Sequence, residues 1–176
     1  MIPVPDKGGN LKNRGAIAEA GVAGTGEIAE PYVVFVVEDD QDDRLLLTKT
    51  LRQSPHIHEI RCYNSGDDLL FHLGKEMYYS DSVIHTLPTV ILLDIHVPGA
   101  SGMVALRQLK THALTSEIPV IISTNDGSEE SMAEAYRLKA DGYLLKPVSL
   151  DDIHSVLARK WQWPDNRSQF QPGHAP

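Results

Sequence analysis

Short apolar runs that each end at a polar or charged residue recur along this chain, and they constrain its fold more than any other feature. The first run, residues 32–37, contains only aromatic and β-branched residues and stops at Glu38. A second run, residues 89–93, stops at Asp94, and a third covers residues 119–124. Runs of this length and composition are typical of strands covered on both faces. The chain is therefore predicted to fold around a parallel sheet.

Stretches with helical periodicity and helix-start signals separate these runs. Leucines 45, 46, 47 and 51 precede Ser54-Pro55, and Ser65 with Asp68 forms a capping box. Asp126 with Glu129 is expected to start a helix that buries Met132, Ala135 and Tyr136. Further strands are predicted over residues 59–63 and 142–146, and a last helix shows apolar residues at 153, 156, 157 and 161. Five strands alternating with five helices predict an α/β fold with helices on both faces of the sheet.

The chain is organised around one central segment. Residues 1–30 hold six of the 13 glycines and no aromatic residue, which predicts a flexible N-terminal extension. The domain itself is predicted over residues 31–161, with an irregular link at 74–88 and a C-terminal tail at 162–176. The tail is too short for a helix-turn-helix.

Charge and cysteine content narrow the possible partners. A net charge of −8 and a pI near 5.4 argue against a nucleic-acid-binding surface. Cys62 is the single cysteine, which excludes an internal disulfide, and it is expected to be a small buried residue of the second strand. No apolar run approaches the roughly 18 residues that cross a bilayer. These features predict a cytoplasmic protein without a membrane partner.

The residues that end the predicted strands carry the chemistry. Glu38 and Asp39 follow the first strand, Asp94 the third and Thr124 the fourth, while Lys146 closes the fifth. The carboxyl ends of parallel strands share one edge, where ligands bind in such sheets. Clustered carboxylates repel one another unless a cation lies among them, and oxygen ligands of this kind suit Mg²⁺. A carboxylate beside Mg²⁺ can act as a nucleophile toward phosphorus, with Lys146 and Thr124 on the phosphate oxygens.

Four motifs in this order resemble the receiver domains of two-component response regulators. They are V-V-E-D-D at 36–40, I-L-L-D-I-H-V-P-G-A-S-G at 91–102, P-V-I-I-S-T at 119–124 and A-D-G-Y-L-L-K-P at 140–147. The resemblance covers about residues 32–160 and implies a flavodoxin-like, doubly wound (βα)5 fold with strand order 2-1-3-4-5. It also implies a cis bond before Pro147.

The resemblance assigns a role to each site residue. Asp94 is the phosphorylated residue, and Lys146 and Thr124 contact its phosphate. Glu38, Asp39 and Asp94 hold Mg²⁺ together with the backbone carbonyl of His96. Thr124 and Tyr143 form the switch, although an aromatic residue in a last strand is often plain core. His96 and Asp126 occupy positions that tune autodephosphorylation.

The implied function is a single-domain response regulator, not an enzyme, which signals through altered protein contacts. Its phosphate donor is a sensor histidine kinase or a histidine phosphotransfer protein. The extended link and the lack of an output domain resemble stand-alone receivers of phytochrome-type kinases. That likeness also implies a homodimer, with the last strand and helix in the contact and Trp161 and Trp163 as contributors.

Other interpretations fit fewer residues. Phosphatases of the haloacid dehalogenase type also use an Asp nucleophile with Mg²⁺, but they carry D-x-D after the first strand, whereas His96 stands two residues after Asp94. A pseudo-receiver that binds partners without phosphate stays open, because Asn125 replaces the usual small alanine and could restrict access to the phosphate. Val97 replaces a common methionine, a change expected to be neutral. The acidic run 38–43 lacks the glycine and distal Glu of an EF-hand, and His56 and His58 lack further clustered ligands.

Overall fold

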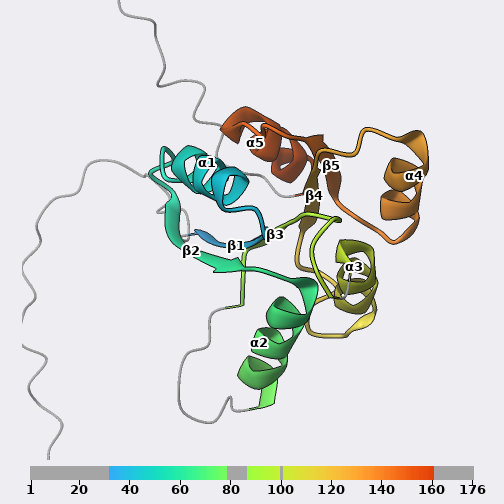
Figure 1. Ribbon diagram of the computed structural model, residues 1–176. Helices are drawn as coiled ribbons and strands as arrows, with labels where there is room; N and C mark the ends of the chain where they lie inside the picture. The colour runs from blue at the N-terminus through green and yellow to red at the C-terminus, as the bar shows by residue number, and fades with distance from the viewer. Residues whose placement is uncertain (1–31, 79–86, 100, 161–176) are drawn as a thin grey trace, which may run out of the picture.

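The computed structural model describes residues 32–78, 87–99 and 101–160, which form one sheet with helices on both sides (Figure 1). All five strands are parallel, in the order β2-β1-β3-β4-β5. They are β1 (Tyr32–Val37), β2 (Ile57–Tyr63), β3 (Val90–Leu93), β4 (Val120–Thr124) and β5 (Gly142–Leu145). The predicted fold class and strand order are thus confirmed.

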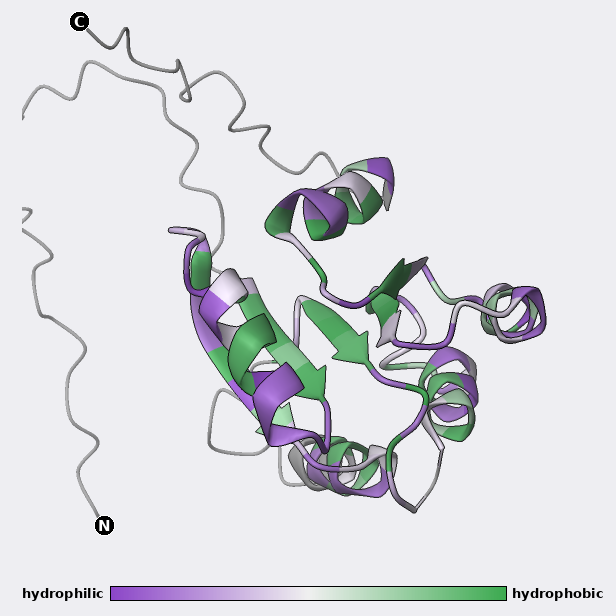
Figure 2. Cartoon of the chain, turned by 45° about the horizontal axis from the view of Figure 1, so that its top comes forward, coloured by the Kyte–Doolittle hydropathy of each residue, from purple (hydrophilic) through white to green (hydrophobic). Residues whose placement is uncertain are grey.

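The helices divide between the two faces of the sheet. Helices α1 (Gln41–Leu51) and α5 (Leu150–Lys160) cover one face, and α2 (Gly66–Tyr78), α3 (Gly102–Thr111) and α4 (Glu129–Arg137) lie on the other. Two separate apolar clusters result, one on each side of the strands. Figure 2 shows the consequence: the central strands are largely apolar, whereas the edge strand β2 is mixed and the helices are apolar only in stripes. The central strands are buried on both faces, as their unbroken apolar runs require.

The start of α4 differs from the sequence prediction. Its N-cap is Ser128, whose hydroxyl accepts a hydrogen bond from the Ser131 N–H, and Asp126 lies before the helix. Of the three residues predicted to be buried, only Ala135 is; Met132 is half-buried and Tyr136 is 51% exposed. The reason is the position of α4, which lies at the outer edge of the molecule beside β5 (Figure 1). A helix in that position has only a narrow covered stripe.

Two further predictions are corrected in the β2 and α2 region. Cys62 is exposed rather than buried, because β2 is an edge strand that pairs with β1 alone. Helix α2 continues to Tyr78, so the first residues of the predicted link at 74–88 are helical. Its start agrees with the capping box, since the Ser65 hydroxyl accepts from the Asp68 N–H at 3.1 Å. The predicted extensions at 1–30 and 162–176, together with Trp161 and Trp163, lie outside the described residues.

At the amino-terminal end of β4, a buried lysine ties three elements together. The Lys110 ammonium of α3 donates to the Ile118 carbonyl at 2.7 Å and to Asp141 Oδ2 at 2.7 Å. The same Asp141 oxygen accepts from the Val120 N–H at 2.8 Å. Asp141 directly precedes β5, so this network fixes the end of the sheet opposite to the strand ends that carry the predicted site.

No helix in the described part of the chain is long and apolar enough to span a membrane.

Gly102 is required where α3 begins. A Cβ atom at this position would collide with the backbone carbonyl oxygen of Asp94 and lie 2.7 Å from the Ile95 Cα. Because backbone atoms cannot move aside cheaply, we expect Gly102→Ala to lower the free energy of unfolding by roughly 1–3 kcal/mol. Urea unfolding measures this change.

Gly74→Ala is the matched control for that substitution. A Cβ at Gly74, inside α2, meets nothing within 4 Å. The substitution is expected to be neutral or to stabilise by roughly 0.5–1 kcal/mol, because alanine favours helices over glycine. Equal effects at both positions would contradict the steric explanation.

Candidate functional site

Two buried carboxylates and one ammonium meet at the carboxyl ends of β1, β3 and β5. The Nζ atom of Lys146 lies 2.6 Å from Glu38 Oε2 and 2.7 Å from Asp94 Oδ2. The three side chains follow their strands directly, as the sequence predicts for a parallel sheet. The bond between Lys146 and Pro147 is cis, also as expected. The structure therefore brings Glu38, Asp94 and Lys146 together.

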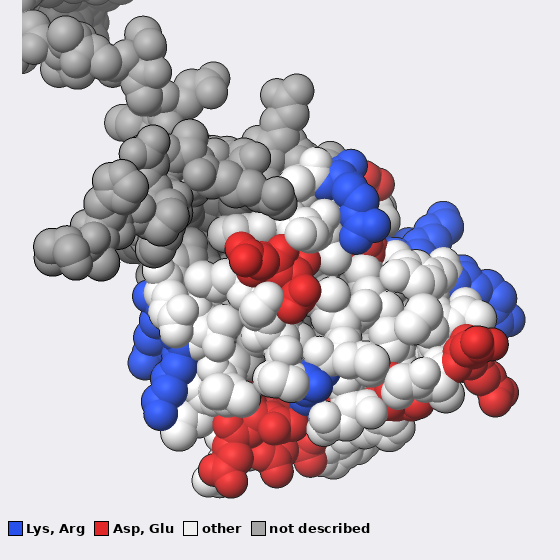
Figure 3. Space-filling model, turned by 90° about the horizontal axis from the view of Figure 1, so that it is seen from above, with Lys and Arg blue, Asp and Glu red and all other residues white. Residues whose placement is uncertain are grey.

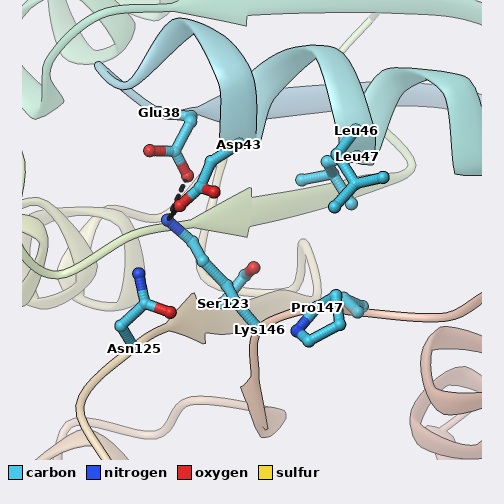
Figure 4. Close-up of a pocket in the computed structure, with 9 residues that line it drawn as sticks. Glu38, Asp43, Leu46, Leu47, Ser123, Asn125, Lys146 and Pro147 are labelled. Carbon is cyan, nitrogen blue, oxygen red and sulfur yellow. Dashed lines mark hydrogen bonds and ion pairs between the residues drawn. The ribbon is translucent and has the colours of Figure 1, made fainter.

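A third carboxylate, Asp43, also reaches this ammonium, and sequence reasoning missed it. Asp43 Oδ2 lies 2.8 Å from Lys146 Nζ, and Figure 4 shows the two side chains pointing toward each other. Asp43 lies in the first turn of α1 rather than at a strand end. Only its place in the acidic run 38–43 could have drawn attention to it.

The charges of these groups are strongly coupled. Burial raises the pKa of Glu38, and the neighbouring Asp94 charge adds to this rise, although Lys146 opposes it. Burial by itself lowers the pKa of Lys146, but its hydrogen bonds to Asp43, Asp94 and Glu38 outweigh burial and raise the pKa above its usual value. Lys146 is therefore protonated at neutral pH. Three carboxylates around one ammonium leave excess negative charge in the site.

The loop between β1 and α1 is held by its own hydrogen bonds. The Asp40 carboxylate caps α1 by accepting from the Asp42 and Asp43 N–H groups, both at 2.9 Å. Arg44 donates to the Glu38 carbonyl at 3.0 Å and to the Asn64 side chain. Asp39, between these anchored residues, is exposed. The loop thus presents the Asp39 carboxylate next to the buried Glu38.

Asp94 is positioned by its backbone as well as by Lys146. Its N–H donates to the Val37 carbonyl at 3.0 Å, and its second carboxylate oxygen, Oδ1, accepts from the His96 N–H at 3.0 Å. The His96 ring lies on the Thr124 side, with Nδ1 3.4 Å from Thr124 Oγ1. Both oxygens of Asp94 therefore have a hydrogen-bond donor.

Thr124 and Tyr143 lie beside this centre. Thr124 is fully buried, and its hydroxyl accepts from the Asp126 N–H at 3.2 Å. The Tyr143 ring belongs to the apolar cluster on the α3 side, and its hydroxyl donates to the Asp126 backbone carbonyl at 2.8 Å. Tyr143 is thus buried in the core of this structure, and its switch role stays a prediction.

A pocket of about 270 Å³ opens at these strand ends (Figure 4). Glu38, Asp43, Ser123, Asn125 and Lys146 form its polar part, and Leu46, Leu47, Pro147 and Val148 form its apolar part. Asn125 is exposed at the rim and points toward Lys146. The larger side chain at this position therefore borders the pocket without filling it.

The carboxylates fit a hard divalent cation. Among residues 32–78, 87–99 and 101–160, no three Asp, Glu, His or Cys side chains are already arranged as a metal site. The Lys146 ammonium contacts both Glu38 and Asp94. The donor set is nevertheless suitable, because Glu38, Asp39 and Asp94 supply carboxylate oxygens and the negative charge exceeds that of one ammonium.

Asp126 has an unusually acidic carboxyl group. The Ser131 hydroxyl and the Ser128 N–H donate to it at 2.5 and 2.8 Å, and these hydrogen bonds lower its pKa from 3.8 to about 2. Its contribution to stability is therefore present above pH 3.8 and is lost as the pH falls through about 2.

We expect an NMR titration of the Asp126 carboxyl carbon to give a midpoint near 2. Ser131→Ala should move this midpoint upward toward 3.8, because the Ser131 hydroxyl is the strongest of the groups that lower it. An unchanged midpoint in Ser131→Ala would contradict this assignment.

The surface charge agrees with the acidic composition. Figure 3 shows acidic side chains in several separate groups, the largest at the lower edge of the face seen from above, whereas Lys and Arg lie mainly toward its margins. This face therefore carries no continuous basic surface of the kind that binds nucleic acid.

A parallel sheet of this strand order, with acidic residues and a lysine at its carboxyl edge, defines the class of receiver domains used in signalling. Comparison with known proteins supports this class at the level of family. The model of the response regulator receiver domain matches residues 34–158. The chain belongs to this family, as its motifs indicate, and the family is one of signalling proteins rather than of catalysts.

Two similar proteins are matched by this chain over most of their own length. Response regulator Rcp1 of Synechocystis sp. is 28% identical over 127 residues, covering 72% of this chain and 84% of Rcp1. The structure of its Mn²⁺-bound form covers 77% of this chain and 96% of that one, with a TM-score of 0.61. Protein PilH of Pseudomonas aeruginosa is 33% identical over 129 residues, covering 71% of this chain and 97% of PilH.

A third similar protein is the bacteriophytochrome response regulator RtBRR. Its structure is 27% identical, covers 73% of this chain and 76% of that chain, and has a TM-score of 0.62. The predicted likeness to receivers of the phytochrome type is thereby confirmed.

Proposed function

We propose that this chain is a single-domain response regulator that accepts a phosphoryl group on Asp94. The observation that carries the proposal is the Lys146 ammonium, which lies within 2.7 Å of both the Asp94 and the Glu38 carboxylates. A carboxylate held at a sheet edge, beside a fixed cation and an open pocket, is suited to attack phosphorus. The folded domain of this regulator comprises residues 31–161, with extensions at 1–30 and 162–176.

The transfer forms one bond and breaks another. An Asp94 oxygen makes a new P–O bond while the bond from phosphorus to the donor breaks, and the donor keeps that electron pair. The donor is a phosphohistidine, so its ring nitrogen is the leaving atom. Lys146 and the Thr124 hydroxyl donate hydrogen bonds to the phosphoryl oxygens, where negative charge accumulates. The site mainly positions the groups and neutralises charge.

Glu38, Asp39 and Asp94, with the His96 backbone carbonyl, would hold Mg²⁺. When bound, this ion neutralises charge on the phosphoryl oxygens. Asp39 is exposed and can turn toward the ion without a loss of buried contacts. Glu38 and Asp94 both contact Lys146 at rest, so these two residues would serve the ion as well as the ammonium.

The phosphorylated state would signal through the surface near Thr124. A phosphoryl group draws the Thr124 hydroxyl away from the Asp126 N–H, and the Asp126 carbonyl is the acceptor for Tyr143. The surface of α4, β5 and α5 then shifts between two states. It already exposes apolar side chains, since Tyr136 and Leu145 are each 51% exposed. This surface suits a protein partner rather than nucleic acid.

The proposed phosphate donor is a sensor histidine kinase or a histidine phosphotransfer protein. The likeness to a bacteriophytochrome response regulator supports a kinase of the phytochrome type. A homodimer through the last strand and helix is part of the same proposal. The chain acts in the cytoplasm, where such kinases expose their phosphohistidine.

The test is phosphoryl uptake from acetyl phosphate, followed by intact mass spectrometry. A gain of one phosphoryl group that requires Mg²⁺ and is prevented by a chelator is expected. Beryllofluoride, a stable mimic of the phosphoryl group, separates a short-lived acyl phosphate from a pseudo-receiver. No gain in mass together with no beryllofluoride binding would contradict the proposal.

A further inference from the structure

The ammonium of Lys146 already has three acceptors. Glu38 Oε2, Asp94 Oδ2 and Asp43 Oδ2 lie 2.6, 2.7 and 2.8 Å from Nζ. An ammonium group has three N–H bonds to donate and no more. A phosphoryl oxygen on Asp94 can therefore receive a hydrogen bond from Lys146 only when one of these carboxylates gives up its own.

Asp43 is the carboxylate that gives up its hydrogen bond at the lowest cost. Its side chain is 35% exposed, whereas those of Glu38 and Asp94 are 2% and 7% exposed. A carboxylate that loses its partner must be hydrated, and water reaches only Asp43 readily. The buried carboxylates of Glu38 and Asp94 therefore keep their contacts with Lys146 at the strand ends.

Hydrogen bonds in α1 hold Asp43 beside Lys146, where it competes with a phosphoryl oxygen for one N–H of the ammonium. Its N–H donates to the Asp40 carboxylate at 2.9 Å, which fixes the first turn of α1. The side chain then extends into the pocket beside Lys146 (Figure 4). The pocket of about 270 Å³ leaves space beside the Lys146 ammonium, which already contacts Asp94.

We infer that Asp43 is a positioning residue that holds Lys146 at rest and slows phosphoryl uptake by Asp94. This inference rests on the proposed function. Two effects of the Asp43 carboxylate act in the same direction. It occupies one N–H of Lys146 that the incoming phosphoryl oxygens need, and its negative charge repels the phosphoryl donor, which is an anion.

Asp43→Asn tests the inference, because it removes the charge and keeps the shape. The rate of phosphoryl uptake from acetyl phosphate is measured at saturating Mg²⁺, so that metal affinity does not enter. In this reaction the Asp94 oxygen bonds to phosphorus and acetate leaves with its electron pair. We expect a maximal rate roughly three- to five-fold above that of the unsubstituted protein, the upper size of one partly exposed charge interaction. The acetyl phosphate concentration at half-maximal rate should fall.

Asp42→Asn is the matched control. Asp42 lies in the same first turn of α1, is exposed, and makes the same change in net charge. Its rate should stay within about two-fold of the unsubstituted protein, because a charge exposed to solvent is screened by salt. Asp43→Ala, which removes the acceptor as well, should be at least as fast as Asp43→Asn.

The outcomes separate this inference from the proposed function. Slower uptake by Asp43→Asn would show that Asp43 merely supports Lys146, and equal rates in Asp42→Asn and Asp43→Asn would reduce the effect to net charge. Either result overturns the inference but leaves phosphorylation of Asp94 in place. An unsubstituted protein that takes up no phosphoryl group and binds no beryllofluoride overturns both.

Discussion

Asp94→Asn is expected to abolish the gain of one phosphoryl group from acetyl phosphate and Mg²⁺. The amide keeps the shape of the side chain but lacks the anionic oxygen that attacks phosphorus. Lys146 keeps Glu38 and Asp43 as partners, so the fold should persist. Intact mass spectrometry, with circular dichroism to confirm folding, measures the result.

Asp151→Asn serves as the control for this experiment. Asp151 is an exposed carboxylate in the first turn of α5 that does not line the pocket, and its substitution makes the same change in mass and charge. It should be phosphorylated like the unsubstituted protein. A mass gain that survives in Asp94→Asn would move the acceptor to another residue and contradict the proposed function.

Lys146→Met is expected to have the largest effect on stability. The substitution keeps an apolar stem but leaves the buried carboxylates of Glu38 and Asp94 without their cation. Removing one partner from a buried ion pair typically costs roughly 3–5 kcal/mol in the free energy of unfolding. Urea unfolding measures this loss. The control is Lys49→Met, at an exposed position of α1, whose free energy of unfolding should lie within about 0.5 kcal/mol of that of the unsubstituted protein.

The loss in Lys146→Met should depend on pH and on divalent cations. Burial already raises the pKa of Glu38, and removal of Lys146 takes away the main group that opposes this rise. When folding raises the pKa of a carboxyl group, the resulting stabilisation is fully present below the pKa of the unfolded chain. This stabilisation is lost as the pH rises through the raised pKa. The loss in the free energy of unfolding should therefore be smaller at about pH 5 than at about pH 8. Mg²⁺ should recover part of this loss. A loss that is equal at both pH values would contradict the electrostatic cause.

The main elements of the site could be predicted because they follow from strand position alone. Glu38, Asp94, Thr124 and Lys146 each end or directly follow a strand, and parallel strands bring these ends to one edge whatever the helices do. The order of apolar runs and helical stretches was enough for the fold class. The strand order and the roles of individual residues came from the resemblance of four motifs to a known family.

The features that sequence reasoning missed all depend on packing. Asp43 reaches Lys146 only because α1 lies against that side of the sheet, which a run of acidic residues does not reveal. The exposure of Cys62 depends on β2 being an edge strand, and that of Tyr136 on how little of α4 is covered. A periodic pattern shows which residues share a face but not how much of that face a neighbour covers.

The two ends of the sheet are built for different mechanical roles. At one end, Lys110 joins α3, β4 and the start of β5 through buried hydrogen bonds, and every group in that network is satisfied within the fold. At the other end, Lys146 is shared among carboxylates of unequal exposure. The Lys110 network therefore fixes the register of the strands at the amino-terminal end of β4. We expect phosphorylation at the opposite end to move the loops there and to leave the strands in place.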